Sequence, residues 1–449
     1  RPHQRAVSAL LWGLFLQMAT LPLVAYYYYS VSVYGVLLNI LLLPFLGVLL
    51  SLGLIGGFLG CVWLPVGACL LNPCHYIFYY YEKMASFFVS LPGAEWIIGK
   101  PHIFQIMIYY TGLFLVVLRL EQWGLEEYEK HQLAIERVSG RFLHQSQSFG
   151  EGRMRVFVSL ACVILLFGLQ WRPIQEFEVV MLSVGQGDGL FVDSGMGKRF
   201  LIDGGSTSTT ELGKYTLLPF LKSRGIASID IWFLTHMDED HISGFIDLAA
   251  GGYPIKTLVL ARAVEQTGKY DQILELCRRR HITVRYMTTK DRIAVQGGLV
   301  QKKEVSFECL GPDWPSLFSG ANENSLVLGL RYQGFEAIFT GDIGTEQEDA
   351  MLAEKRLSEF ARDGRVELLK AAHHGSNGSN GTEWLSVVDP VLIVISAGKN
   401  NRYHHPGKEA VERMDGLKLK HLCTIECGQI SVRWKDGKMW VERYKAEKK

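Results

Sequence analysis

The stretch FLTHMDEDHISG places four potential metal ligands within six residues: His236, Asp238, Asp240 and His241. They come directly after an apolar run that has the composition of a buried strand. Imidazole nitrogens and carboxylate oxygens together suit divalent cations such as Zn²⁺ and Mn²⁺. This segment alone cannot complete a coordination shell, so other parts of the chain must supply further ligands.

Polar side chains also follow several other apolar runs in the second half of the chain. They are Asp203 in LIDGG, Asp342 in FTGD, His373 and His374 in LKAAHHGS, and His404 and His405 in VISAGKNNRYHHP. A single histidine at the end of a strand is more often structural than a metal ligand. Five clusters that all end apolar strands predict instead that the ends of these strands meet at one rim, where ligands converge.

The elements that must position these residues begin near Ile174, where short β-branched runs alternate with helical stretches. Strands are predicted at 176–184, 189–195, 199–205, 229–236, 257–261, 306–311, 325–332, 336–342, 366–372 and 391–398, with closing strands near CTIECG, ISVRWK and MWVERY. Helices are predicted at 211–224, 242–250, 270–280, 345–362 and 408–415. This mixture of strands and helices predicts a layered α/β sandwich.

The first third of the chain has few charges and long apolar runs. A membrane-spanning helix needs about 20 apolar residues to cross a hydrocarbon core of about 30 Å. Spans are predicted at 6–29, 104–120 and 156–171, and the run 33–71 is expected to hold two spans broken near Pro44 or near the glycines at 56–57. The stretch 76–91 contains Glu82 and Lys83, so an amphipathic or interfacial helix is expected there.

The charged segment between the last two predicted spans indicates their orientation. Its basic residues near the helix ends are Arg119, Lys130, Arg137, Arg141, Arg153 and Arg155. Positive residues that flank spans mark the cytoplasmic side. We therefore expect a membrane region at 1–120, a charged cytoplasmic linker at 121–155, a transmembrane helix at 156–171, and a soluble domain at 172–449 outside the cytoplasm.

Composition limits the classes of protein and function that remain possible. The formal net charge is +1, so no strongly basic domain indicates nucleic acid by charge alone. The eight cysteines lack zinc-finger or CxxC spacing, and Cys423 and Cys427 are expected to be unpaired. No GxxxxGK[ST] motif is present, so a nucleotide-driven step must come from another protein. Because the sequence begins at an arginine, we expect the C-terminal part of a longer protein.

The motifs carry a family resemblance. HMDEDH resembles the HxHxDH signature of the metallo-β-lactamase fold, with Asp238 in place of the second histidine. The whole set resembles the ComEC family of DNA-internalisation competence proteins, in SVGQGDGLFV, LIDGG, NENSLVLGLRY, FTGD, LKAAHHGS and VISAGKNNRYHHP, and in LPLVAYYYYSVSVYGVLLNILLLPFLGVLL of the membrane part. The resemblance implies a polytopic α-helical membrane region followed by an α/β metallo-β-lactamase-like domain, an αββα sandwich. Residues 1–120 would be the C-terminal part of the competence (channel) domain.

The resemblance also implies a function in DNA uptake during natural transformation. The membrane part would contribute to a channel for single-stranded DNA, and the soluble domain would be a metal-dependent deoxyribonuclease that degrades the strand not imported. Two divalent ions, Mn²⁺ or Zn²⁺, are expected, because paired metals hold both the attacking water and the phosphate oxygens. The implied ligands are His236 and Asp238 for one ion, Asp240 (also catalytic) and His241 for the other, Asp342 as a bridge, and either His373 or His374. Asp238 in place of histidine favours the harder Mn²⁺.

Five further residues have predicted roles with alternatives. Asp203 would orient a ligand, and Asn324 would ligate weakly or position phosphate. Ser376 would contact phosphate or simply belong to a turn, and Asp188 would bind metal or cap a turn, the turn being favoured. His405 would act as a general acid, complete the metal shell, or be structural.

Location and partners follow from the same resemblance. We expect a multi-pass protein of the bacterial inner membrane that meets single-stranded DNA in the channel and duplex DNA at the nuclease. Other competence proteins, including a DNA receptor and an ATP-driven translocase, would be its partners. Two alternatives stay open: a transport protein whose lactamase-like domain only binds DNA or braces the channel, and a hydrolase of a small ester or lactam.

Overall fold

The protein is described by a computed structural model that covers residues 2–136, 144–172, 176–297, 303–361 and 364–444. Its contacts divide into two compact units. The helical unit comprises Arg1–Trp171 with Leu221–Ile226, and the sheet unit comprises Arg172–Phe220 and Ala227–Lys449.

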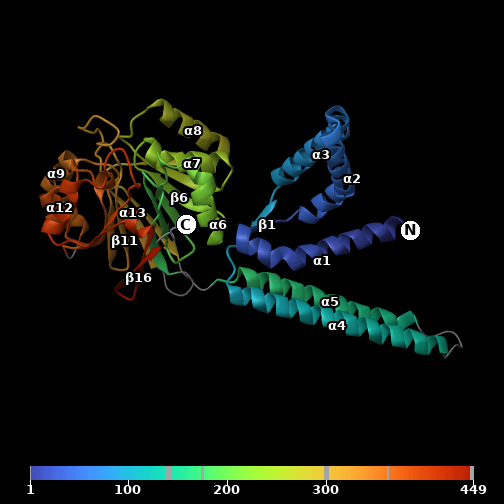
Figure 1. Ribbon diagram of the computed structural model, residues 1–449. Coiled ribbons are helices and arrows are strands. Elements are labelled where there is room, and N and C mark those ends of the chain that lie inside the picture. The colour runs from blue at the N-terminus through green and yellow to red at the C-terminus, as the bar shows by residue number, and fades with distance from the viewer. Residues whose placement is uncertain (1, 137–143, 173–175, 298–302, 362–363, 445–449) are drawn as a thin grey trace. The chain divides into compact units, whose positions relative to one another are not determined.

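The helical unit contains five long helices and one two-stranded antiparallel sheet among its described residues (Figure 1). The helices are α1 (Pro2–Tyr28), α2 (Gly35–Val62), α3 (Leu64–Ser90), α4 (Ile103–Glu136) and α5 (His144–Gln170), and the strands are β1 (Ser30–Ser32) and β2 (Glu95–Ile97). The described part of the predicted linker 121–155 is therefore helical. Two of its basic residues, Arg137 and Arg141, lie outside the described residues.

Helices α2 and α3 form a close hairpin. A Cβ atom added to Gly67 would lie 2.3 Å from the Cα of Gly60, so only glycine permits this approach. The predicted break near Pro44 or residues 56–57 is wrong, because α2 continues through both. The chain turns instead at Trp63, which is extended, and Pro65 lies in the first turn of α3, where its missing N–H costs no helical hydrogen bond.

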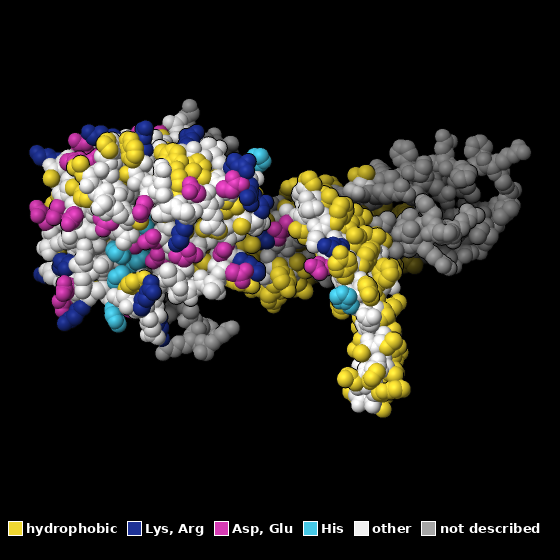
Figure 2. All heavy atoms as spheres, turned by 90° about the horizontal axis from the view of Figure 1, so that it is seen from above, with side chains coloured by type: hydrophobic (Ala, Val, Ile, Leu, Met, Phe, Trp, Pro, Cys, Tyr) yellow, Lys and Arg dark blue, Asp and Glu magenta, His cyan; other side chains and the backbone are white. Residues whose placement is uncertain are grey.

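Two described helices are long and apolar enough to cross a membrane: Gly35–Val62 and Ile103–Glu126. At 1.5 Å per residue, their 28 and 24 residues extend about 42 and 36 Å, enough for a hydrocarbon core of about 30 Å. The apolar helix Val156–Gln170 is shorter. Figure 2 shows hydrophobic side chains over most of the described surface of this unit, as expected for contact with lipid.

The sheet unit contains two mixed sheets. The eight-stranded sheet has the order β17-β16-β3-β4-β5-β6-β7-β8, and the seven-stranded sheet has the order β15-β14-β13-β12-β11-β10-β9. Strands of the first are β3 (Phe177–Met181), β4 (Gly189–Asp193), β5 (Arg199–Asp203), β6 (Ile229–Leu234), β7 (Ile255–Ala261), β8 (Thr283–Met287), β16 (Gln429–Lys435) and β17 (Lys438–Tyr444). Strands of the second are β9 (Arg292–Gly297), β10 (Lys303–Gly311), β11 (Val327–Tyr332), β12 (Phe335–Phe339), β13 (Val366–Lys370), β14 (Pro390–Ile395) and β15 (His421–Cys423).

The two sheets pack face to face through alternating apolar side chains. In β6, Phe233 points into the core between the sheets, where its ring centroid lies 4.7 Å from that of Phe307 in β10. The intervening Trp232 points to the opposite face and meets Phe245 of the outer helix at 5.2 Å. This alternation follows from the two-residue period of a strand whose two faces are both covered.

Helices cover the outer face of each sheet, which gives four layers (Figure 1). Helices α7 (Glu239–Ala250) and α8 (Gly268–Arg280) lie on the eight-stranded sheet, and α9 (Thr345–Ala353), α11 (Thr382–Val388) and α12 (Lys408–Gly416) lie on the other. The predicted αββα sandwich is confirmed.

Several element predictions need correction. The predicted helix 345–362 is divided into α9 and α10 (Arg356–Phe360), because Lys355 adopts a left-handed conformation. The predicted helix 211–224 is a π-helical turn (Gly213–Leu217) followed by α6 (Leu218–Ser223). CTIECG is not a strand throughout: β15 ends at Cys423 and α13 (Thr424–Cys427) follows. Strands β8 and β9 and helix α11 were not predicted.

Candidate metal centre

The polar clusters of the sequence lie at the carboxyl ends of parallel strands. Strand β5 pairs in parallel with β6, and β13 pairs in parallel with both β12 and β14. Parallel neighbours bring their carboxyl ends to the same edge of a sheet. Residues that end or follow these strands are Asp203 (β5), His236, Asp240 and His241 (β6), Asp342 (β12), His373 and His374 (β13), and His405 (β14).

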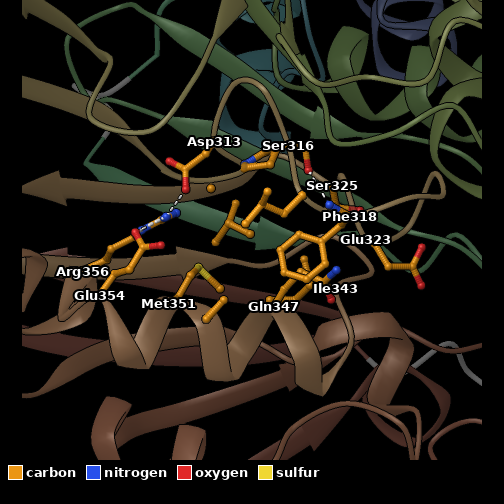
Figure 3. Close-up of a pocket in the computed structure, with 15 residues that line it drawn as sticks. Asp313, Ser316, Phe318, Glu323, Ser325, Ile343, Gln347, Met351, Glu354 and Arg356 are labelled. Atoms are coloured by element: carbon orange, nitrogen blue, oxygen red, sulfur yellow. Dashed lines mark hydrogen bonds and ion pairs between the residues drawn. The ribbon is translucent and has the colours of Figure 1, made fainter.

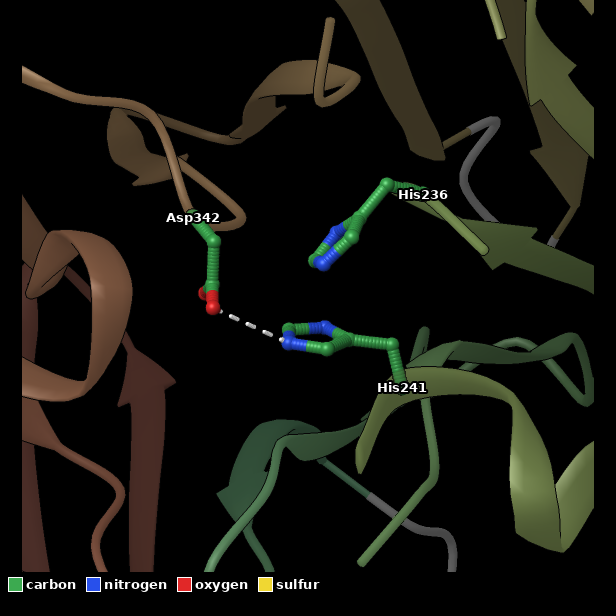
Figure 4. Close-up of side chains that lie close together, drawn as sticks. All are labelled: His236, His241 and Asp342. Carbon is green, nitrogen blue, oxygen red and sulfur yellow. Dashed lines mark ion pairs between the residues drawn. The ribbon is translucent and has the colours of Figure 1, made fainter. Parts of the chain in front are cut away.

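Three buried imidazoles converge on one carboxylate. The Nε2 atoms of His241 and His374 each lie 3.3 Å from Oδ2 of Asp342. The ring of His236 lies 4.0 Å from that of His241, measured between centroids. Figure 4 shows His236 and His241 pointing toward Asp342 from the other side of the site. Ligand atoms of these three residues all lie within 4.8 Å of one another, close enough to share one cation.

Asp240 extends this group. Its Oδ2 lies 3.4 Å from Nε2 of His374, and Asp240, His241 and His374 form a second set whose ligand atoms lie within 4.8 Å. We call His236, Asp240, His241, Asp342 and His374 the His–Asp cluster. Its members come from three segments that lie between residues 236 and 374, and they follow strands of both sheets.

The opposite ring nitrogen of His241 is held by Asp203. Nδ1 of His241 donates to Oδ2 of Asp203 at 2.9 Å, since a carboxylate can only accept. Asp203 is itself fixed by Thr235, whose backbone N–H and hydroxyl each donate to it at 2.8 Å. The lone pair of a neutral His241 is therefore on Nε2, facing the cluster. An acid that holds a histidine in this way orients it toward a metal.

His374 is held in the same manner. Its Nδ1 lies 3.1 Å from the carbonyl oxygen of Ser396 and 3.2 Å from Oδ1 of Asp188, both acceptors. Nδ1 of His236 lies 3.2 Å from the hydroxyl of Ser325 and 3.1 Å from that of Thr235. All three rings are thus fixed through Nδ1.

The Nε2 atoms of His236, His241 and His374 are buried and make no hydrogen bond among the described residues. Three unsatisfied imidazole nitrogens beside carboxylates are the donor set that a divalent cation requires, because buried polar atoms are otherwise hydrogen-bonded. The residues present therefore fit a metal.

The electrostatics favour positive charge at this point. Burial raises the pKa of Asp342, but His374, His241 and Lys370 outweigh it and hold that pKa well below 3.8. Burial lowers the pKa of His241, but Asp342 and Asp203 raise it well above 6.5. The pKa of His236 is lowered well below 6.5 by burial and by His241, so its ring is neutral. The carboxylate is ionised and attracts cations.

His373, His374 and His405 differ in position. His374 is buried and belongs to the cluster, whereas the side chain of His373 is 33% exposed and its Nε2 lies 3.8 Å from Asp342. The ring of His405 lies 5.9 Å from that of His374. Burial, with His374 and His373 nearby, lowers the pKa of His405 to about 4.

Three other predicted residues lie at the margin. The side chain of Asp238 is 54% exposed, with Oδ2 3.8 Å from Nε2 of His236. Nδ2 of Asn324 donates to the carbonyl of Gly320 at 2.9 Å, so its side chain closes the preceding loop. The hydroxyl of Ser376 accepts from the N–H of Gly378 at 3.2 Å, which is a turn contact.

Asp188 and Lys370 lie buried beside the cluster. Sequence analysis favoured a turn for Asp188, but its carboxylate contacts Lys370 and His374. Lys370 was missed. Its Nζ donates to the carbonyl of Gly341 at 2.8 Å and lies 3.4 Å from Oδ1 of Asp342. The available signal was a lysine ending an apolar strand, directly before AAHH.

A separate cavity of about 70 Å³ adjoins the centre at Ser325 (Figure 3). Its walls are mainly apolar and come from α9, with Met351, and from the segment that contains Phe318. Arg356 pairs with Asp313 at one end. No residue of the His–Asp cluster lines this cavity, so it is distinct from the candidate metal centre.

Comparison with known proteins agrees with this architecture. The family described as Competence protein matches residues 1–123, and the Metallo-beta-lactamase superfamily matches residues 182–399. The chain joins a competence protein domain to a metallo-beta-lactamase domain. The resemblance to a competence domain and to a metallo-β-lactamase domain, which the sequence motifs indicated, is therefore confirmed.

Two curated relatives match most of this chain. ComE operon protein 3 of Bacillus subtilis (strain 168) is 28% identical over 444 residues, which cover 94% of this chain and 51% of that protein. Competence protein ComA of Neisseria gonorrhoeae is 26% identical over 64% of this chain and 37% of its own length. The chain thus spans about half the length, or less, of these relatives.

The solved structures that match the chain are more distant in sequence. The metallo-beta-lactamase fold protein YhfI from Bacillus subtilis is 12% identical with a TM-score of 0.36, covering 59% of this chain and 100% of that protein. A diphosphatase from the PhnP family is 14% identical with a TM-score of 0.34, covering 57% of this chain and 98% of that protein.

Proposed function

We propose that the sheet unit is a metal-dependent phosphodiesterase that cuts DNA, and that the whole chain serves DNA uptake. The observation that carries the proposal is the convergence of three buried, unpaired Nε2 atoms on the carboxylates of Asp342 and Asp240. The match to the competence family supports DNA as the substrate.

The ligands would hold two divalent ions, Mn²⁺ or Zn²⁺. Asp240, His241 and His374 would hold one, His236 with Asp238 would hold the other, and Asp342 would lie between them. When bound, such ions activate water and neutralise charge on a phosphate. Asp203 and Asp188 would keep the imidazoles aligned. The carboxylate at position 238 favours Mn²⁺, because carboxylate oxygen is a harder ligand than imidazole nitrogen.

The helical unit would place this activity at a membrane. Apolar helices α2 and α4 would span the bilayer of a bacterial inner membrane and contribute to a path for single-stranded DNA. Basic residues at or next to the ends of the apolar runs 104–120 and 156–171, such as Arg119 and Arg155, would lie on the cytoplasmic side, and residues 172–449 would then lie outside the cytoplasm. There the hydrolase would meet duplex DNA and degrade the strand not imported. A DNA receptor and an ATP-driven translocase would be partners.

The test uses the 449-residue chain in detergent micelles with fluorescently labelled single-stranded and duplex DNA. With Mn²⁺ or Zn²⁺ we expect cleavage, which excess EDTA abolishes. Asp240→Asn should lower the rate at least about 100-fold, because losing a ligand carboxylate removes several kcal/mol of charge stabilisation.

The matched control is Asp271→Asn, an equally conservative change at an exposed position of α8. It should cut DNA at the wild-type rate. Uncut DNA at every metal concentration, or equal losses in both variants, would refute the phosphodiesterase proposal.

A DNA-binding domain without catalysis is the second candidate, and Lys370 favours it. Its buried ammonium contacts both Asp188 and Asp342, so part of the acidic charge is balanced without a metal. Metal analysis of the purified chain separates the candidates: about one to two ions per chain supports the enzyme, and none supports the binding domain.

A further inference from the structure

The loop after β14 carries an aromatic side chain that the proposed chemistry does not use. In GKNNRYHHP, which spans 398–406, the side chain of Tyr403 is exposed. The loop is polar, with Lys399 and Arg402 as its basic residues and no acidic residue. A tyrosine at such a position adds little to the apolar core, and its ring is accessible to a ligand.

Asn401 holds this loop in a defined shape. Its Oδ1 accepts from the backbone N–H groups of Tyr403 at 3.1 Å and His405 at 2.9 Å. Its Nδ2 donates to the carbonyls of Gly398 at 2.9 Å and His405 at 2.6 Å. One side chain thus closes the loop from both sides, so the position of Tyr403 is fixed before any ligand binds.

The ring of Tyr403 lies next to the candidate metal centre. It stacks on His405, with centroids 5.6 Å apart and planes 21° apart. His405 in turn lies 5.9 Å from the ring of His374, a member of the His–Asp cluster. Together, the two distances between ring centroids correspond to the length of about two or three nucleotides of a strand, at about 3.4 Å each.

Arg402 adds a planar cation. Its guanidinium lies over the Tyr403 ring, 4.6 Å from the centroid, and it also contacts the tyrosine hydroxyl. Arg402 is exposed and, among the described residues, makes no other hydrogen bond or ion pair, so the guanidinium is free to move aside. Figure 2 shows histidine side chains gathered on the surface of the sheet unit with basic side chains beside them.

We propose that Tyr403 is a stacking platform for a base of single-stranded DNA, within about three nucleotides of the phosphate held at the His–Asp cluster. The base takes the place of the Arg402 guanidinium on the ring, and Arg402 then pairs with a backbone phosphate. Aromatic stacking combined with a basic side chain is the general means of binding a single strand without reading its sequence. The inference rests on the proposed phosphodiesterase function and names its substrate contact.

The test compares two substrates and three variants of the full chain in micelles. The substrates are a fluorescent thymidine oligonucleotide and its counterpart with abasic sites at the central positions. Binding is measured by fluorescence anisotropy in EDTA, and KM and kcat are measured with Mn²⁺. Tyr403→Ala should raise Kd and KM for the thymidine oligonucleotide about tenfold, within the range for loss of one stacked base. On the abasic substrate the same variant should differ from wild type less than about twofold.

Tyr403→Phe keeps the ring and should behave as wild type, which separates stacking from the hydroxyl. Tyr444→Ala, at an exposed tyrosine of β17, is the matched control and should have no effect. Equal losses on both substrates, or no loss in Tyr403→Ala, would overturn the inference.

The two proposals fail separately. If Tyr403 governs binding in EDTA but the DNA is not cut with any metal, the phosphodiesterase falls and the stacking platform stands. If DNA is cut normally and Tyr403→Ala binds and cuts like wild type, the platform falls and the phosphodiesterase stands. If the wild-type chain neither binds nor cuts, both fall.

Discussion

Asp203→Asn tests whether the His–Asp cluster binds metal through an oriented imidazole. Oδ2 of Asp203 accepts from Nδ1 of His241 at 2.9 Å, and Oδ1 accepts from the N–H of Thr235 at 2.8 Å. An amide has one acceptor oxygen and one donor nitrogen. If its oxygen keeps the Thr235 N–H, its NH₂ group faces His241 and forces the ring proton onto Nε2, the atom that would bind metal.

The expected loss of metal affinity follows from that change of tautomer. Losing the partner that orients a metal-bound histidine lowers metal affinity about 10- to 100-fold, or about 1.4 to 2.7 kcal/mol. The backbone should tolerate the change, because Asp203 has φ +53° and asparagine adopts this left-handed conformation readily. Equilibrium dialysis of the purified chain against Mn²⁺, followed by metal analysis, measures the affinity.

Asp230→Asn is the matched control. Asp230 is also largely buried and accepts from Lys256, Lys198 and the backbone N–H of Arg199, but it belongs to none of the metal-ligand groups. Its substitution should leave Mn²⁺ affinity within about twofold of wild type, the scatter expected when no ligand is touched. The reasoning is refuted if Asp203→Asn binds Mn²⁺ as tightly as wild type while its melting temperature is unchanged, or if both variants lose affinity equally.

Three further predictions concern the charge, backbone and burial around the centre. Asp342→Asn should reduce the metal content of the purified chain to below about a tenth of wild type, because it removes the shared carboxylate. Gly187→Ala should lower both melting temperature and metal content, since its Cβ would lie 2.2 Å from the carbonyl oxygen of Gly205 and 2.6 Å from that of Asp240. Burial raises the pKa of Glu348 from 4.5 to about 7, so wild type loses stability as pH rises through that interval. Glu348→Gln removes the titrating group, so its free energy of unfolding should change by up to about 3 kcal/mol less than that of wild type between about pH 5 and pH 8, measured by unfolding at both values. Its absolute stability should be lower, because both carboxylate oxygens of Glu348 accept from backbone N–H groups, those of Asn380 and Gly381, and an amide has only one acceptor oxygen.

The sequence predicted the strands whose side chains alternate between two covered faces. Strand β6, with Trp232 outward and Phe233 inward, has the strong apolar run that such burial requires. Strands β8 and β9 were missed because several of their side chains are exposed, so neither apolar run is evident. The break at Trp63 was misplaced because a proline inside an apolar helix, such as Pro44, need not end it when neighbouring groups take up the freed carbonyl.

The candidate ligands could be read from the sequence because each follows an apolar strand. The residues that these ligands contact could not be read from the sequence. The choice between His373 and His374 depends on two successive left-handed residues that turn only the second ring inward. The buried contact of Lys370 with Asp188 joins residues 182 positions apart, and no local pattern indicates it.

The His–Asp cluster draws on both halves of the sandwich: Asp240 and His241 follow the eight-stranded sheet, and Asp342 and His374 follow the seven-stranded one. A cation held there would link the two sheets. During synthesis the metal site cannot be complete until His374 has left the ribosome, so a chain that stops earlier lacks at least one ligand. A cation bound there would add to the apolar packing between the two sheets, and chelation should therefore lower the melting temperature of the chain.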